Sequence, residues 1–274
     1  MIKVGDNLKN IKIIFTDLDG TLKDSNQRIS IRHKRIIEKL ANIGVPVVFT
    51  TGRNIPYTAS LSKQFSASSY IISSNGAEIY NYSNENIIYT SVISKNDVKS
   101  IGELIKKYNL LFTTNYLNKI YTNKKSVNSG RKIINSIDEV IEENISQIIL
   151  ESDNVEVMKK VETEITNIKD IKISNRTQNF KNNNKNVFFD ITNKNVSKGN
   201  AIKILCDYLK ISLDKSMAIG DSNNDIEMLE NARIKIAMNN ATEDLKQVAN
   251  YITLSNDQEG VAIILEHLYD ELIK

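Results

Sequence analysis

The residues with the clearest chemical potential in this sequence are two aspartates one residue apart, Asp17 and Asp19. They follow a short apolar run, residues 11–15, which predicts a buried strand of a parallel sheet that delivers Asp17 at its carboxyl end. Gly20 and Thr21 come next, in a tight turn whose backbone N–H groups can point at an anion. Two carboxylates this close repel each other, so we expect a divalent cation at one and a proton-transfer role for the other.

Turns of this composition also end ordinary strands, because Asp and Gly are common turn residues. A functional interpretation therefore depends on which side chains follow the other strands of the sheet. In open α/β sheets, ligands bind at the carboxyl ends of the strands.

Polar loops follow other predicted strands and open predicted helices. They contain Thr51, Gly52 and Arg53 after strand 45–50; Asn75 and Gly76 after strand 70–73; Lys198 near the start of helix 197–209; and Asp221, Asn224 and Asp225 after strand 216–219. Right-handed crossovers keep such loops on one edge of a parallel sheet, so we expect them to face Asp17 and Asp19.

The order of predicted helices and strands in the middle of the chain differs from that at its two ends. Segments 78–81 and 86–90 predict a hairpin that leaves the sheet. Helices are predicted at 94–108 and 155–168, among strands at 110–116, 120–122, 147–151, 171–174 and 187–191. The Asn- and Lys-rich run 179–186 predicts a solvated turn. We therefore predict a Rossmann-like α/β core of residues 1–82 and 190–274, interrupted by an α+β domain of residues 83–189 that is well placed to act as a lid.

Length and composition are those of an ordinary globular protein of one large or two smaller domains. The chain has 274 residues, of which 41% are hydrophobic and 25% charged, and no stretch reaches the apolar length of a membrane span. The first ten residues carry Lys3, Asp6 and Lys9 without an apolar segment, so we expect no secretory signal and a cytoplasmic location. The net charge of +3 is spread along the chain, so we expect neither a nucleic-acid nor a membrane partner.

Together, the residue types at these strand ends suit phosphoryl transfer. A carboxylate can attack phosphorus, a bound cation can neutralise the phosphoryl oxygens, and a second carboxyl can protonate the leaving alcohol. Taken singly, a lysine at a helix start or an acid in a first helical turn is usually structural. Their occurrence on successive strand ends favours a functional site.

The order of these motifs resembles that of the haloacid dehalogenase (HAD) superfamily: DLDGT at 17–21, TTGR at 50–53, the lysine of VSKGNA at 196–201, and GDSNND at 220–225. The SNGA segment at 74–77 and the large insertion are similar to the Cof-type sugar-phosphatase branch of that superfamily. This resemblance covers the whole chain. It implies a HAD-like phosphohydrolase core with an inserted α+β cap domain.

The resemblance also implies a role for each motif residue. Asp17 would be the nucleophile that forms an aspartyl-phosphate, and Asp19 the general acid and then base. Thr51, Gly52, Lys198 and Asn224 would hold the phosphoryl group. Mg²⁺ would be bound by Asp17, the backbone carbonyl of Asp19 and Asp221, with Asp225 in support. Arg53, Asn75 and Gly76 are candidates for substrate contacts.

The function predicted on this basis is Mg²⁺-dependent hydrolysis of a small phosphate monoester, such as a sugar phosphate or a phosphorylated cofactor. An acid at position 19 favours ester hydrolysis, because the resemblance implies that ATPases of the superfamily carry Thr there. A phosphomutase and a non-catalytic sensor of a phosphorylated ligand are the alternatives. The expected partner in every case is a small phosphorylated metabolite.

Overall fold

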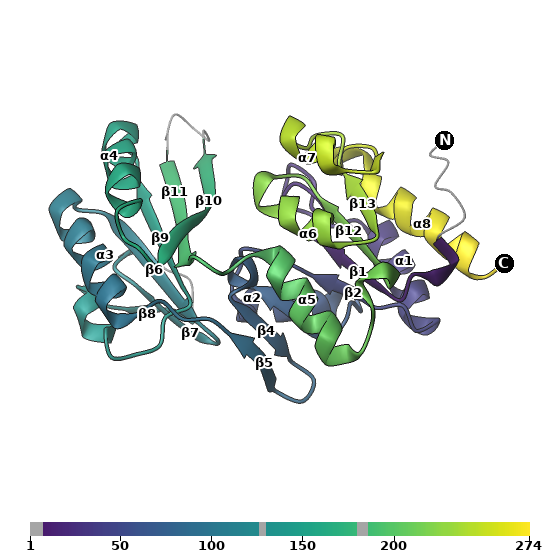
Figure 1. Cartoon of the computed structure of the whole chain (residues 1–274), viewed down its shortest axis with the longest axis horizontal. Coiled ribbons are helices and arrows are strands. Elements are labelled where there is room, and N and C mark those ends of the chain that lie inside the picture. The colour runs from purple at the N-terminus through teal and green to yellow at the C-terminus, as the bar shows by residue number, and fades with distance from the viewer. Residues whose placement is uncertain (1–7, 126–129, 180–185) are drawn as a thin grey trace. The chain divides into compact units, whose positions relative to one another are not determined.

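The computed structural model describes residues 8–125, 130–179 and 186–274 (Figure 1). The chain forms two compact units: one comprises the residues up to Tyr89 together with Ser197–Lys274, and the other is Thr90–Val196. The divisions lie seven residues later than the expected 82/83 and 189/190. The hairpin strand Asn86–Thr90 belongs to a sheet of the first unit, and the last strand of the second unit runs on to Asn193.

The first unit is built on a five-stranded sheet in the order β14-β13-β12-β1-β2, in which every neighbouring pair is parallel. The strands are β1 (Ile13–Thr16), β2 (Val47–Phe49), β12 (Ser216–Gly220), β13 (Ile234–Ala237) and β14 (Tyr251–Ile252). β1 and β12 are buried along their whole length, which explains why their sequences are predominantly apolar. The predicted α/β fold with a parallel-sheet core is thus confirmed.

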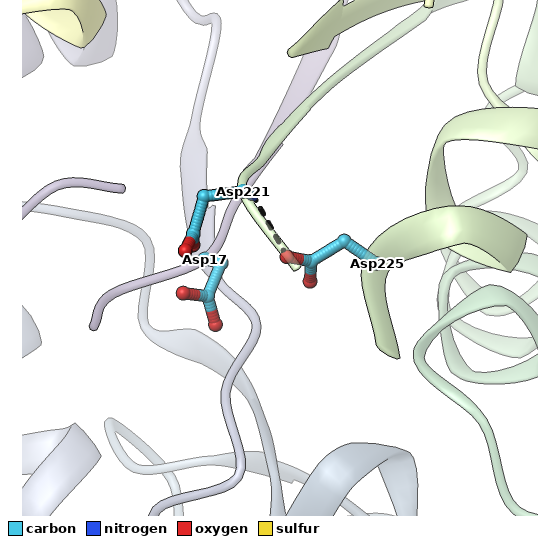
Figure 2. Close-up of side chains that lie close together, drawn as sticks. All are labelled: Asp17, Asp221 and Asp225. Atoms are coloured by element: carbon cyan, nitrogen blue, oxygen red, sulfur yellow. Dashed lines mark hydrogen bonds between the residues drawn. The ribbon is translucent and has the colours of Figure 1, made fainter. Parts of the chain in front are cut away.

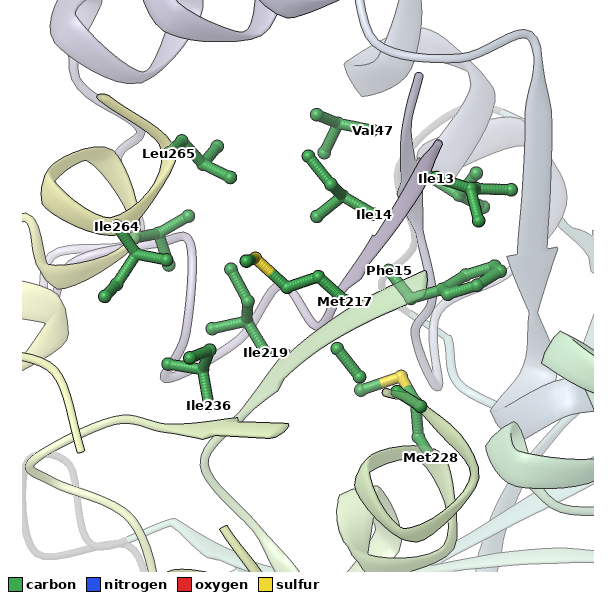
Figure 3. Packing of buried hydrophobic residues seen from close by; sticks show 14 of the residues in the cluster. Ile13, Ile14, Phe15, Val47, Met217, Ile219, Met228, Ile236, Ile264 and Leu265 are labelled. Carbon is green, nitrogen blue, oxygen red and sulfur yellow. The ribbon is translucent and has the colours of Figure 1, made fainter. Parts of the chain in front are cut away.

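Helices supply the apolar side chains that bury this sheet: α1 (Ile31–Asn42), α2 (Ile55–Gln64), α5 (Lys198–Leu209), α6 (Ile226–Asn231), α7 (Glu243–Val248) and α8 (Gly260–Leu272). Figure 3 shows Ile14 with Leu265 of α8 on one side of the sheet, and Phe15 with Met228 of α6 on the other. The alternation of successive β1 side chains between the two faces makes both helix layers part of one core.

A small sheet in the order β3-β4-β5 continues the first unit beyond β2. Its strands are β3 (Tyr70–Ser73), β4 (Glu78–Asn81) and β5 (Asn86–Thr90). The N–H of Thr51 donates to the carbonyl of Ile72 over 2.9 Å, so β3 runs beside the end of β2. The turn Ser74–Gly76 after β3 therefore lies next to the loop after β2.

The second unit has its own six-stranded sheet, in the order β10-β11-β9-β6-β7-β8, and its own apolar core. Its strands are β6 (Leu111–Tyr116), β7 (Lys119–Thr122), β8 (Lys132–Ile133), β9 (Gln147–Ser152), β10 (Ile171–Asn179) and β11 (Asn186–Asn193), and its helices are α3 (Lys95–Tyr108) and α4 (Val155–Ile165). All pairings are antiparallel except β7 with β8. This is the expected α+β domain. Residues 180–185 of the predicted solvated turn lie outside the described residues.

In the described part of the chain, no helix is both long enough and apolar enough to cross a membrane.

Candidate active site

The Asp17–Lys23 loop begins directly after β1 and is closed by main-chain contacts. The N–H of Asp17 donates to the carbonyl of Ile219 in β12 over 3.0 Å, and the N–H of Lys23 donates to the carbonyl of Leu18 over 2.9 Å. Gly20 has φ +88°, and a Cβ at this position would lie 2.4 Å from Oδ2 of Asp221. The turn therefore requires glycine, because only glycine combines this backbone conformation with so close a neighbour.

A buried lysine joins two of the carboxylates. Lys198 is the first residue of α5, whose N-cap is Ser197, and its side chain is 1% exposed. Its Nζ lies 2.6 Å from Oδ1 of Asp17 and 2.6 Å from Oδ1 of Asp225. Burial favours the neutral amine, but the charges of Asp17 and Asp225 outweigh it and raise the pKa of Lys198. The lysine is therefore a cation at neutral pH.

Three acids form the centre of the site. Asp17, Asp221 and Asp225 each offer a carboxylate oxygen, and these atoms lie within 4.8 Å of one another (Figure 2). Burial raises the pKa of Asp17 well above its usual value; the charges of Asp225 and Asp221 add to this and Lys198 opposes it. Burial and the charge of Asp225 raise the pKa of Asp221 to about 7. Such a set of mutually repelling carboxylates fits a hard divalent cation, which prefers oxygen ligands.

Asp225 is held by the loop after β12. Its Oδ2 accepts hydrogen bonds from the N–H groups of Asp221 and Ser222, both over 3.1 Å, and its side chain is fully buried. A Cβ at Gly220 would lie 2.6 Å from the Cβ of Asp225, so the strand end leaves room for this side chain. Asp221 is in turn oriented by the hydroxyl of Thr21, which donates to its Oδ1 over 2.6 Å.

Two cations bind the carboxylate of Asp19. Arg53 donates from Nε to Oδ2 over 2.7 Å and from Nη2 to Oδ1 over 3.0 Å, and Nζ of Lys23 lies 3.1 Å from Oδ1. Burial alone would raise the pKa of Asp19, but the hydrogen bonds and charges of Arg53 and Lys23 outweigh it and lower the pKa. In this arrangement Asp19 is a carboxylate at neutral pH.

The remaining predicted residues lie around the ends of β2 and β3. The hydroxyl of Thr51 accepts from the N–H of Arg53 over 3.2 Å, and Gly52 lies between them in the chain. The carbonyl of Thr51 accepts from the N–H of Asn75 over 3.0 Å, and the side-chain amide of Asn224 donates to Oδ1 of Asn75 over 3.0 Å.

Gly76 brings the turn after β3 against the start of α5. It has φ +100°, and a Cβ at this position would lie 2.3 Å from the carbonyl oxygen of Ser197. All the residues predicted from the sequence thus belong to loops at the carboxyl ends of β1, β2, β3 and β12 or to the first turn of α5, within one unit.

Sequence reasoning missed the contacts of Lys23 and Thr21. The available signal was local: Lys23 lies four residues after Asp19 in the same loop, within reach of its carboxylate. A single lysine in a turn is nevertheless solvated in most proteins. Its burial follows from the packing of Tyr57 in α2, which the sequence pattern does not indicate.

Comparison with known proteins agrees with this geometry. Residues 14–265 match the family of haloacid dehalogenase-like hydrolases. The 5-amino-6-(5-phospho-D-ribitylamino)uracil phosphatase of Bacillus subtilis is 29% identical over 259 residues, covering 94% of this chain and 96% of its own. A haloacid dehalogenase-like hydrolase of B. subtilis superposes with a TM-score of 0.81 at 27% identity, covering 94% of this chain and 100% of its own. A subclass IIB sugar phosphatase superposes with a TM-score of 0.77 at 25% identity, covering 93% and 98%.

The parallel sheet carries at one edge a cluster of three acids whose oxygen atoms are close enough together to hold a metal ion. The chain belongs to the haloacid dehalogenase-like hydrolases, and its relatives place it among the phosphatases of that family. The resemblance drawn from the four sequence motifs is therefore confirmed.

Proposed function

We propose that the protein hydrolyses small phosphate monoesters through an aspartyl-phosphate on Asp17 and that it requires Mg²⁺. The observation that carries the proposal is the buried arrangement of Asp17, Lys198 and Asp225, with Asp221 beside them and Asp19 two residues from Asp17. It combines an acid positioned to be a nucleophile, an acid for proton transfer, a fixed cation and a carboxylate cluster. The metal would be held by Asp17, the backbone carbonyl of Asp19 and Asp221, with Asp225 in support.

In the first step, a carboxylate oxygen of Asp17 forms a bond to phosphorus while the bond from phosphorus to the leaving oxygen breaks. For this step Asp19, which is a carboxylate while Arg53 and Lys23 both bind it, first takes up a proton from solvent; it then gives that proton to the leaving oxygen, so an alcohol leaves. In the second step, Asp19 takes a proton from water as the water attacks the phosphorus of the aspartyl-phosphate. Inorganic phosphate leaves and the Asp17 carboxylate is restored.

Four residues are assigned to holding the phosphoryl group during both steps: the hydroxyl of Thr51, the backbone of Gly52, the ammonium of Lys198 and the side-chain amide of Asn224. Lys198 is the strongest candidate, because a buried ammonium already fixed by two acids needs little reorganisation to stabilise added negative charge. When bound, the divalent cation would neutralise charge on the phosphoryl oxygens. Arg53, Asn75 and Gly76 remain candidates for substrate contacts.

The substrate class follows from the relatives. One is named for a substrate with a phosphate on a ribityl chain, and another is a sugar phosphatase. We therefore propose a sugar phosphate or a phosphorylated cofactor precursor as the substrate. We assign selection of the leaving alcohol to the inserted unit Thr90–Val196, which contains none of the residues assigned to catalysis, metal or phosphate.

The test is phosphate release from phenyl phosphate and a panel of sugar phosphates, with Mg²⁺ and with a chelator. We expect release by the wild type with Mg²⁺, none with chelator, and none by Asp17→Asn, because the amide is a far weaker nucleophile than the carboxylate. Asp19→Asn should lower kcat by about 100-fold or more through loss of the proton donor.

Phosphorus NMR of the products separates hydrolysis from phosphoryl transfer to a second hydroxyl. Inorganic phosphate supports a phosphatase, whereas an isomeric sugar phosphate means a mutase. Equal turnover by wild type and Asp17→Asn would exclude the aspartyl-phosphate route.

A further inference from the structure

Lys23 is a buried lysine outside the set assigned to phosphate and metal. Its side chain is 2% exposed, and its Nζ lies 3.1 Å from Oδ1 of Asp19. Its backbone is fixed on both sides: the N–H donates to the carbonyl of Leu18 over 2.9 Å, and the carbonyl accepts from the side-chain amide of Asn256 over 2.8 Å. A lysine side chain is rarely buried unless its charge is paired, and Asp19 provides that charge.

Tyr57 connects Lys23 to the loop after β2. The Lys23 ammonium lies 4.6 Å from the centroid of the Tyr57 ring and donates a hydrogen bond to the Tyr57 hydroxyl. The guanidinium of Arg53 lies 5.6 Å from the centroid of the same ring. One aromatic side chain of α2 therefore contacts both cations that bind Asp19, and both contacts are of the cation–π type.

The two cations differ in their access to solvent. Arg53 is 51% exposed, whereas Lys23 is 2% exposed. Arg53 pairs with Asp19 through two parallel hydrogen bonds, and a phosphate or carboxylate can accept the same two bonds from an arginine. Arg53 can therefore exchange partners when an anion arrives, while Lys23 is enclosed by the loop and by Tyr57.

We propose that Lys23 is a positioning residue that keeps the Asp19 carboxyl in place when Arg53 exchanges its contact with Asp19 for one with the anionic substrate. This inference rests on the proposed function, in which Asp19 must transfer a proton to the leaving oxygen. Among the residues that the structure describes, Lys23 and Arg53 are the cations paired with Asp19, so without Lys23 the release of Arg53 leaves the Asp19 carboxyl with no cationic partner to fix its rotamer. Tyr57 supports the arrangement by holding the Lys23 ammonium.

The test compares kcat/KM for two aryl phosphates that differ in how much the leaving group needs a proton. Phenyl phosphate releases a basic phenolate, whereas p-nitrophenyl phosphate releases a stable anion. In Lys23→Met we expect kcat/KM for phenyl phosphate to fall by about 10- to 100-fold, and for p-nitrophenyl phosphate by less than about threefold, because only the first reaction relies on a well-placed acid. Tyr57→Phe, which keeps the ring, should give a smaller change with the same preference.

Lys63→Met is the matched control, since Lys63 lies in the last turn of α2 over the ring of Tyr82 rather than over that of Tyr57; it should leave both values unchanged. A crystal structure of Lys23→Met with inorganic phosphate should show the Asp19 carboxyl displaced from its wild-type position. Equal losses for both esters, or an unmoved Asp19, would overturn the inference. If the wild type hydrolyses neither ester, the proposed function fails, and the position of Asp19 in that structure alone decides for or against Lys23.

Discussion

The charged side chains of the site occupy buried positions at which apolar side chains would stabilise the folded protein more. Asp17, Lys198 and Asp225 are all buried, and the two acids are each paired with Lys198. Desolvating such a set costs several kcal/mol per ion, and the mutual attraction returns this only in part. The arrangement is therefore better explained by chemistry than by folding stability.

Glycine at position 20 offers a direct test of how closely the loops fit. Gly20→Ala adds a methyl group 2.4 Å from the carboxylate of Asp221 at a backbone φ of +88°. We expect phosphatase activity to fall at least tenfold and the free energy of unfolding to fall by about 2–4 kcal/mol, from left-handed backbone strain plus the clash. Steady-state kinetics and urea unfolding measure the two effects.

Gly44→Ala is the matched control for that variant. Gly44 also has a positive φ, +79°, but a Cβ there meets nothing within 4 Å. This variant should lose only about 1–2 kcal/mol of stability and keep full activity. If the two variants behaved alike, contact with Asp221 would have no part in the effect.

The strand ends made the acids of the site predictable. Asp17 and Asp221 each follow an apolar run, and parallel strands bring such positions to one edge. Distances between side chains were not predictable in this way. The pairing of Arg53 with Asp19 depends on rotamers, and the burial of Lys23 depends on an aromatic ring from α2, so neither leaves a periodic signal in the sequence.

Helix α1 contains a histidine that the fold keeps neutral. His33 is buried near the N-terminus of the helix, where its Nδ1 lies 3.0 Å from the hydroxyl of the N-cap Ser30. Burial lowers its pKa to about 4; the charge of Arg32 adds to this, while Glu259 and Glu266 oppose it. In the unfolded chain the pKa of a histidine is about 6.5. Below that pH the unfolded chain therefore binds a proton at His33 that the folded chain does not bind until the pH nears its lower pKa.

We therefore expect His33 to reduce stability as the pH falls from about 6.5 towards 4, by about 2 kcal/mol at pH 5. The measurement is urea unfolding of wild type and His33→Gln at pH 5, 6 and 7. The quantity of interest is the difference between the two proteins, because buried acids such as Asp221 contribute slopes of the opposite sign. The advantage of wild type over His33→Gln should shrink as the pH falls.

A constant difference between wild type and His33→Gln at all three pH values would show that His33 does not cause the effect.

Most regular elements were predictable because their apolar spacing is strong, and the exceptions have local causes. β3, β4 and β5 have the predicted bounds. The helix expected at 155–168 ends instead at Ile165, with Thr166 as its C-cap. β8 has only two residues, too few to show an alternating pattern.

The order of elements in the sequence predicted a core that is interrupted by an inserted domain, but it did not predict the residues at which the two units divide. The return of strand–loop–helix units after residue 197 indicated that the two ends of the chain share one sheet. The first boundary lies later than predicted because β5 pairs with β4 and so belongs to a sheet of the first unit.

The inserted unit provides a prediction for the protein as a whole. Replacing Thr90–Val196 by the corresponding segment of a relative should change the ranking of sugar phosphates while leaving the Mg²⁺ requirement intact, because the carboxylates lie entirely in the first unit. Phosphate release across the panel, with and without chelator, measures both properties. Loss of metal dependence after the exchange would contradict the assignment.

The placement of β1 between β2 and β12 has a consequence for the newly made chain. β1 leaves the ribosome before its neighbour β12, which follows about 200 residues later; at ordinary rates of synthesis this interval is roughly ten to forty seconds. The contiguous unit Thr90–Val196 is complete before then. Throughout this interval one edge of β1 lacks its partner and Asp17 lacks Lys198. We therefore expect a nascent chain stalled before residue 198 to be catalytically inactive. We also expect chaperones to bind it, because its apolar strand is exposed.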